Sequence, residues 1–173
     1  MTIETIDNAP LEEESSAALE GKYLTFLLGE EVYGLGILKV QEIIGIMKVT
    51  AIPQVPEYVR GVINLRGKVI PVLELRSKFG LAACEDTERT CVIVVQVMED
   101  AAQRTMGIIV DEVSEVADVR EDNIEPPPSF GNTVETDFIL GMAKIGDGVV
   151  TLLDVDDILS GQDVALSKCN ITT

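Results

Sequence analysis

The residue types that most often carry chemistry in proteins are sparse in this chain. Histidine is absent from its 173 residues, which removes the commonest general base and the commonest metal ligand. The three cysteines, Cys84, Cys91 and Cys169, lack Cys-x-x-Cys spacing, and no activating base lies near any of them in the sequence. We therefore interpret them as reduced thiols and expect neither a cysteine nucleophile nor a disulfide.

Two other patterns resemble ligand sites only in part. Gly34 and Gly36 are too closely spaced for a dinucleotide-binding turn, and they indicate local flexibility or a close backbone approach. Asp154, Asp156 and Asp157 lack the spacing of an EF-hand loop and suit the positive end of a short helix. We expect no catalytic residue, no cofactor and no metal, so the sequence favours a protein that works by binding other proteins.

The charge balance excludes several kinds of partner. The formal net charge is −17 at pH 7, and such a field repels nucleic-acid phosphates and anionic lipid. No apolar run approaches the ~18 residues of a membrane-spanning helix. No basic and apolar secretory leader begins the chain, so we expect a cytoplasmic protein that binds no nucleic acid and inserts into no membrane. An acidic docking role and a solubilising surface both explain the charge; we prefer the solubilising surface.

The strongest structural signal is a duplicated hairpin. Residues 61–75 place two apolar runs around the turn Asn64-Leu65-Arg66-Gly67, where Gly67 supplies the positive φ that such turns need. The second run, Val69 to Leu73, is apolar on both faces and predicts a strand buried on both. Eighty positions after Gly61 and Glu74, the pattern returns with Gly141 and Asp154; residues 34–43 likewise align with 107–116. A repeat in two copies predicts two similar β modules.

The organisation of the chain follows from this repeat. Strands are expected at 23–28, 32–38, 91–97 and 106–110, with short helices at 74–79 and 154–159. Residues 39–44 fit a helical turn as well as a strand. We expect a flexible acidic tail over residues 1–20, which hold six acids and no Lys or Arg, and a frayed tail over 161–173. The patterned region, 21–160, divides into a first barrel at about 21–85 and a second at about 86–160.

Several of these segments together resemble the CheW-like family of bacterial chemotaxis adaptors. The resemblance is carried by Val32-Tyr33-Gly34-Leu35, by residues 37–43, and by the hairpin from Gly61 through Asn64-Leu65-Arg66-Gly67 to Pro71. Residues 107–116 and 124–130 continue it, so that it covers roughly residues 21–160. It implies a mainly β fold, with two SH3-like five-stranded β-barrels packed side by side and a few short helices.

The resemblance also implies a function. It predicts a non-enzymatic scaffold that couples the cytoplasmic tips of chemoreceptors to the regulatory domain of the histidine kinase CheA, and that is a monomer when free. A CheW-like adaptor of a non-flagellar pathway, such as twitching, is an alternative. A small-ligand-binding β-barrel protein is a more remote one. A nucleic-acid-binding barrel is disfavoured by the acidic charge.

The family's binding surfaces transfer to this sequence residue by residue. The resemblance predicts a groove between the barrels that receives the receptor's helical hairpin, with Asn64, Leu65 and Gly67 forming a structural turn beside it. Glu42 and Arg66 carry opposite charges; they either pair at the rim of the groove for binding or merely fix the hairpin. The predicted groove residues are Val40, Glu42, Gly61, Arg66 and Val116.

A second surface is predicted to contact the kinase. Phe130, which follows the proline-rich loop, matches a family position used for ring closure with the kinase domain. The end of the first barrel is expected to be the main kinase-binding face, again by resemblance alone. Its residues are Val49, Ile52, Pro53 and Pro56.

Overall fold

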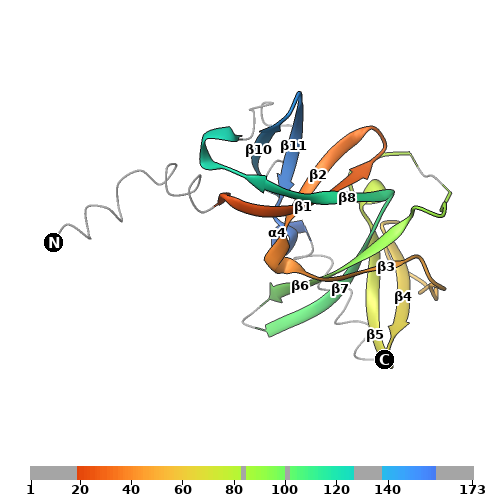
Figure 1. Ribbon diagram of the computed structural model, residues 1–173. Helices are drawn as coiled ribbons and strands as arrows, with labels where there is room; N and C mark the ends of the chain where they lie inside the picture. The colour runs from red at the N-terminus through yellow and green to blue at the C-terminus, as the bar shows by residue number, and fades with distance from the viewer. Residues whose placement is uncertain (1–18, 83–84, 100–101, 127–137, 159–173) are drawn as a thin grey trace.

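In the computed structural model, the chain forms two β-sheets and a few very short helices (Figure 1). The described residues are 19–82, 85–99, 102–126 and 138–158. Sheet A has six strands in the order β8-β1-β2-β11-β10-β9, and sheet B has five in the order β3-β6-β7-β5-β4. The expected mainly β fold is confirmed, although β9, a strand of two residues, gives sheet A a sixth member.

The strand bounds follow the expected apolar runs closely. Sheet A contains β1 (Gly21–Leu28), β2 (Glu31–Gly36), β8 (Glu112–Val119), β9 (Ile124–Glu125), β10 (Ile139–Ile145) and β11 (Gly148–Leu153). Sheet B contains β3 (Val40–Gly45), β4 (Val59–Leu65), β5 (Lys68–Glu74), β6 (Cys91–Glu99) and β7 (Ala102–Val110). The helices are η1 (Ile37–Lys39), α3 (Leu75–Lys78), η2 (Glu121–Asn123) and α4 (Val155–Ile158). The segment left open at 39–44 is therefore a strand that follows a short 3₁₀ turn.

The two sheets exchange strands between the two copies of the repeat. Hairpin β1–β2 lies in sheet A, but β3, β4 and β5, which follow it in the chain, lie in sheet B. The second copy does the reverse, with β6–β7 in sheet B and β8 to β11 in sheet A. The sheets therefore do not follow the expected division into residues 21–85 and 86–160.

Short connections explain the exchange. Only Asp111 separates β7 from β8, whereas the tightest common hairpin uses a turn of two residues. The chain cannot fold back beside β7, and it continues into the other sheet. The three residues of η1 carry β2 into β3 in the same way.

Parallel strand pairs join the two copies within each sheet. β2 runs parallel to β11 in sheet A, and β5 runs parallel to β7 in sheet B. The two hairpins that the repeat identified occupy equivalent places. The amide of Glu74 donates to the carbonyl of Tyr58 at 2.7 Å, and the amide of Asp154 donates to that of Phe138 at 2.8 Å, both eighty positions apart.

The main hydrophobic core lies between the sheets. It contains side chains of both copies, among them Phe26, Leu35, Ile93 and Ile108, all fully buried. Two smaller hydrophobic clusters lie inside the curved sheets, one in sheet A and one in sheet B. Each fully buried large apolar side chain contributes about 1.5–3 kcal/mol relative to exposure. The shared core therefore makes the two copies mutually dependent.

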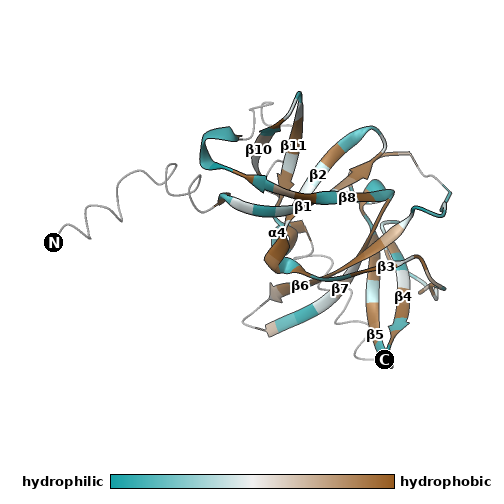
Figure 2. Cartoon of the chain, in the orientation of Figure 1, coloured by the Kyte–Doolittle hydropathy of each residue, from teal (hydrophilic) through white to brown (hydrophobic). Residues whose placement is uncertain are grey.

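β6 shows why an uninterrupted β-branched run appears in the sequence. Its Ile93, Val95 and Val97 face the core between the sheets, whereas Val92 and Val94 face the interior of sheet B. Neighbouring β7 begins with exposed residues and becomes buried as it enters the body, which Figure 2 shows as a change from teal to brown. The expectation for β5 is wrong at one residue, because Val69 lies next to the hairpin turn and is 64% exposed.

Two ion pairs, which we call latches, lie at the two places where the chain passes from one sheet to the other. In the first, Arg76 on α3 binds Asp111 through Nε and Nη2 at 2.9 Å, and the amide of Gly29 donates to the same carboxylate at 2.7 Å. In the second, Asp156 on α4 accepts from Lys39 Nζ at 2.6 Å and from the amide of Met98 at 3.1 Å. Each latch ties a short helix to a crossover and to the end of a hairpin.

The first latch makes stability depend on pH. Burial alone would raise the pKa of Asp111, but the hydrogen bonds from Arg76 and from the Gly29 amide outweigh it and hold the pKa below its ordinary value of 3.8. The resulting stabilisation is present above that ordinary value and is lost as pH falls through the lowered folded-state pKa. We expect Asp111→Asn to reduce the free energy of unfolding by about 1–3 kcal/mol near neutral pH, and the difference from wild type to narrow below about pH 4.

Urea unfolding followed by circular dichroism across this pH range measures the effect. Asp118→Asn is the matched control, because Asp118 pairs with Lys22 on the exposed surface, where such pairs contribute about 0–1 kcal/mol. Equal losses in the two variants would show that the latch has no special role.

Candidate functional site

The sequence-predicted pair Glu42 and Arg66 forms a two-pronged ion pair. Arg66 Nη1 donates to Glu42 Oε2 at 2.7 Å, and Nη2 donates to Oε1 at 2.5 Å. Glu42 lies on β3 and Arg66 in the β4–β5 turn, and β3 and β4 are the two ends of the strand order in sheet B. The ion pair therefore joins the two edges of that sheet and closes its curved shape.

The pair lies at the surface. The exposed fraction of the side chain is 68% for Arg66 and 24% for Glu42. The hydrogen bond from Arg66 lowers the pKa of Glu42, and the bond to Glu42 raises the pKa of Arg66. Because water and salt screen exposed charges, we assign the pair a role in positioning the hairpin more than in stability.

The turn that presents Arg66 has the backbone the sequence predicted. Arg66 and Gly67 are its two central residues, with φ of 53° and 87°, the signature of a type I′ turn. Asn64 Oδ1 accepts from the Gly67 amide at 2.7 Å and locks the turn. Leu65 packs against the cluster inside sheet B and anchors the hairpin end. The positive φ expected at Gly67 is confirmed.

Gly61 is explained by packing. It is buried in β4 with a φ of 148°, and a Cβ there would lie 2.1 Å from the carbonyl oxygen of Thr50. Thr50 and Val62 exchange backbone hydrogen bonds at 2.8 and 2.9 Å, so this close approach positions the preceding loop against the hairpin. Gly61 thus supports the site from inside.

Val40 and Val116 lie on the edge strands of different sheets. Val40 on β3 is half-buried and packs against the core between the sheets, and Val113 on β8 does the same from the other sheet. Val116 is 49% exposed. In Figure 1, β8 and β3 run across the same face of the molecule, above and below its middle. The structure therefore brings Glu42 and Arg66 into contact, and it places Val40 and Val116 on edge strands of different sheets.

The predicted kinase-facing residues surround the loop before β4. Val49 packs against the cluster inside sheet B, Ile52 and Pro56 are half-buried, and Pro53 is exposed. This loop offers a mixed surface next to the Thr50–Val62 bridge. Phe130 lies outside the described residues.

Sequence reasoning missed one prominent apolar residue, Leu38. It was assigned to the end of a strand, but it lies in η1 and is 96% exposed. It borders a pocket of about 560 Å³. An apolar residue inside a short 3₁₀ turn has no hydrophobic periodicity around it. The sequence therefore could not predict that the Leu38 side chain is exposed. The pocket is lined mainly by β1, η1 and the start of α4, and its lining includes Tyr23, Leu38, Lys39, Leu140 and Val155.

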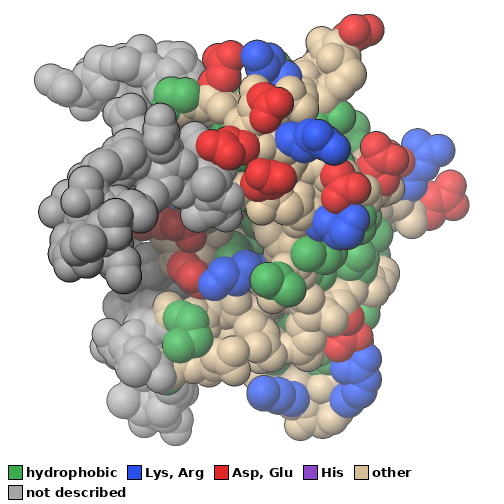
Figure 3. Space-filling model, turned by 60° about the vertical axis from the view of Figure 1, so that its left-hand side comes forward, with side chains coloured by type: hydrophobic (Ala, Val, Ile, Leu, Met, Phe, Trp, Pro, Cys, Tyr) green, Lys and Arg blue, Asp and Glu red, His purple; other side chains and the backbone are tan. Residues whose placement is uncertain are grey.

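The surface mixes charges of both signs. Figure 3 shows acidic and basic side chains interleaved on one face, with hydrophobic side chains exposed between them. Among the described residues no group of three or more His, Cys, Asp or Glu side chains is arranged to hold a metal ion. A search of the same residues for a helix long and apolar enough to cross a membrane found none.

Comparison with known proteins identifies the family. The family model for the CheW-like domain matches residues 22–163, most of the chain. The chain belongs to the CheW-like family. The chemotaxis protein CheW of Klebsiella aerogenes is 40% identical over 145 residues, which cover 84% of this chain and 85% of that protein. CheW of Rhizobium meliloti is 33% identical over 140 residues, covering 81% and 88%.

A solved structure supports the same conclusion. The crystal structure of the scaffolding protein TtCheW from Thermoanaerobacter tengcongensis superposes on this CheW-like chain with a TM-score of 0.72 at 35% identity. The match covers 83% of this chain and 95% of that one. The relatives' names and this scaffold together support an adaptor role in chemotaxis.

The hairpin turn of this CheW-like protein provides a test of backbone strain. We expect Gly67→Val to lower the free energy of unfolding by about 1–3 kcal/mol, because a β-branched residue is strained at positive φ. A Cβ at Gly67 meets no atom within 4 Å, so a clash does not contribute. Gly45→Val is the control: Gly45 also has open space but no positive φ, and its change should stay within about 0.5 kcal/mol. Urea denaturation compares the two, and similar losses would contradict the strain argument.

Proposed function

We propose that this chain is a non-enzymatic cytoplasmic adaptor that couples the cytoplasmic tips of chemoreceptors to the regulatory domain of the histidine kinase CheA in signalling arrays. The main support is the Glu42–Arg66 pair, which fixes the β4–β5 hairpin against the edge strand β3. The family relationship makes chemotaxis the setting. Neither partner is present in the structure, and both are part of the proposal.

The receptor side uses a surface that suits a helix. An amphipathic helix docks its apolar stripe into a groove and places charged residues at the rim. Val40 and Val116 supply apolar contacts from the two sheets, and Glu42 and Arg66 supply charges of both signs. Gly61 contributes by holding the hairpin in position against Thr50.

The kinase side has two candidate faces. The first is the loop containing Val49, Ile52, Pro53 and Pro56, as the family resemblance predicts; the same resemblance predicts a separate ring contact at Phe130 on the second barrel. The second is the region of Leu38, whose nearly complete exposure beside a pocket makes it a suitable interface anchor. The two faces are formed by different loops, so mutations can separate them.

A second candidate function is favoured by the same pocket. Its volume of about 560 Å³ falls within the range of small-ligand sites, so a small-ligand-binding β-barrel protein is the alternative. A bound metabolite would stabilise the fold by mass action. A thermal-shift screen against a metabolite library separates the two functions, because the adaptor requires no ligand. The adaptor could act in a non-flagellar pathway such as twitching. A deletion strain tested separately for swimming and for twitching distinguishes this pathway from a flagellar one.

Co-sedimentation provides the direct test of the adaptor. Membranes carrying the cognate receptor are spun with the CheA kinase, with and without this chain. The adaptor function requires that the chain appear in the pellet and increase the amount of kinase recovered there. If it neither binds the kinase's regulatory domain nor sediments with receptors at tens of micromolar, the proposal fails.

Arg66→Glu addresses the receptor side. We expect the variant to remain folded, because the ion pair it destroys is exposed, and to bind receptor about tenfold more weakly because two acids then face each other. Lys22→Glu is the matched control, since it also removes an exposed ion pair, with Asp118, but in the other sheet from Arg66. Receptor affinity and the thermal midpoint are measured together. A variant that no longer folds would show that Arg66 is structural.

Leu38→Glu addresses the kinase side. We expect at least a tenfold loss of affinity for the kinase's regulatory domain, about 1.4 kcal/mol or more, from burying a charge in an apolar contact. Stability should be unchanged, since the side chain is almost fully exposed. Val69→Glu changes another exposed apolar residue, on the receptor-side hairpin, and should leave kinase binding intact. Isothermal titration measures both, and an unaffected Leu38→Glu variant would remove this face from consideration.

A further inference from the structure

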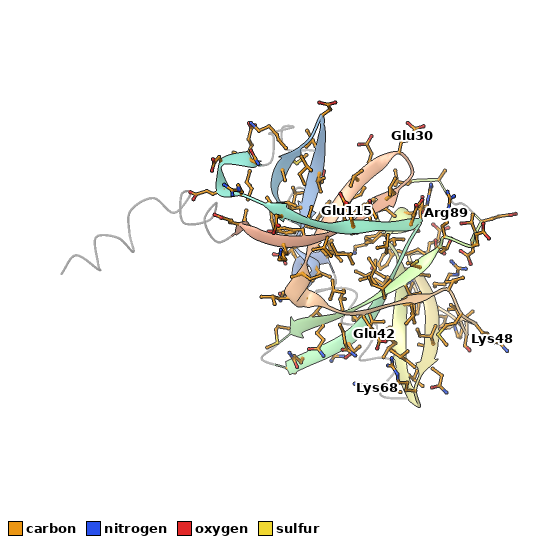
Figure 4. The ribbon with its side chains drawn as sticks, in the orientation of Figure 1. Glu30, Glu42, Lys48, Lys68, Arg89 and Glu115 are labelled. Atoms are coloured by element: carbon orange, nitrogen blue, oxygen red, sulfur yellow. The ribbon has the colours of Figure 1, made fainter. Side chains whose placement is uncertain are left out.

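The two copies of the repeat place a glutamate at the same bulge. In sheet B, Val40 pairs with Val95 and Glu42 with Val94, and the register shifts between Val40 and Glu42. In sheet A, Val113 pairs with Phe26 and Val116 with Leu24, and the register shifts across the two residues between them, Ser114 and Glu115. The alignment of residues 34–43 with 107–116 matches Glu42 with Glu115. Glu115 is therefore the structural counterpart of Glu42. Figure 4 labels both, Glu115 beside β8 and Glu42 near β3.

The partner of the glutamate differs between the copies. In the first copy, the two-residue turn after Leu65 begins with Arg66 at φ 53°. In the second, the equivalent turn after Ile145 begins with Gly146 at φ 60°. The backbone is the same, but the arginine side chain is absent. Within the described residues, the carboxylate of Glu115 makes no ion pair and no hydrogen bond.

The backbone of Glu115 is nevertheless held firmly. The buried hydroxyl of Thr25 donates to the carbonyl oxygen of Glu115 at 2.7 Å and accepts from the Glu115 amide at 3.1 Å. These two bonds fix the bulge and therefore the direction in which the glutamate leaves the strand. The next residue is Val116, which is half exposed. The site thus offers a positioned acid whose carboxylate has no partner among the described residues.

We propose that Glu115 accepts an ion pair from an arginine or lysine on the receptor's helical hairpin, in the role that Arg66 plays for Glu42 within the chain. This inference rests on the proposed adaptor function and names the chemistry of the partner at the same surface. In the first copy of the repeat, Arg66 pairs with Glu42 within the chain. In the second copy, a cation on the docking helix would pair with Glu115 in the same way. The net charge of −17 also favours the approach of a basic helix face.

Charge variants test the acceptor directly. Affinity for a soluble cytoplasmic fragment of the cognate receptor is measured for wild type, Glu115→Gln and Glu115→Lys. We expect losses of about threefold and at least about tenfold, with Glu115→Gln showing a weaker dependence on salt than wild type. Asp118→Lys is the control on the same strand, because Asp118 is already paired with Lys22, and its affinity should change less than about twofold.

A second variant supplies the missing arginine from within. A Cβ at Gly146 would meet no atom within 4 Å, and the equivalent Arg66 already adopts this backbone conformation. We expect the new arginine to pair with Glu115 and to weaken receptor binding by about tenfold relative to Gly146→Gln, which carries the same backbone strain. Gly146→Gln, which has the same backbone but no charge, should bind nearly as wild type. In a Glu115→Gln background, Gly146→Arg should have no further effect, as a double-mutant cycle would show.

The outcomes separate the two proposals. If wild type fails to bind the receptor fragment, the adaptor function fails and this inference with it. If wild type binds and both Glu115→Lys and Gly146→Arg bind equally well, the adaptor function stands and Glu115 is only a solvated carboxylate. Loss of binding in Glu115→Lys with a normal thermal midpoint, together with binding by Asp118→Lys, supports the inference.

Discussion

The shared apolar core between the sheets is the constraint on which the rest of the structure depends. Strands β1 and β2 of one copy and β6 and β7 of the other press their apolar faces together, so neither sheet has a complete core without its neighbour. Parallel pairing of β2 with β11 and of β5 with β7 adds backbone hydrogen bonds across the same division. The outer surfaces, which carry the candidate contacts, are positioned by this interior.

Because the sheets exchange strands, the candidate surfaces of the two copies lie at equivalent positions, on the edge strands of the two sheets. β3 and β8 are edge strands of opposite sheets, and each has a register shift beside a glutamate. Each sheet also contains a hairpin whose turn has the same left-handed start, at Arg66 or Gly146. The two copies of the repeat therefore present the same backbone at two places on the surface, one with an arginine side chain and the other without it.

Much of the local structure could be predicted because short-range rules determine it. The Asn64 to Gly67 turn needs positive φ, and the β-branched run of β6 needs burial on both faces. The pairing of β2 with β11 could not be predicted, because a parallel contact between distant segments leaves no periodic signal in either one. The exposure of Leu38 was hidden for a related reason, since it depends on where η1 directs the chain. The opposite charges of Glu42 and Arg66 predict their ion pair. That Glu115 is the counterpart of Glu42 and lacks such a partner follows only from the strand register.

The crossovers at η1 and Asp111 have a mechanical consequence. The first copy crosses from sheet A to sheet B at η1 and the second crosses back at Asp111, so each sheet contains strands of both copies. If the chain were cut between β5 and β6, the two fragments would remain joined by the backbone hydrogen bonds of the β2–β11 and β5–β7 pairs.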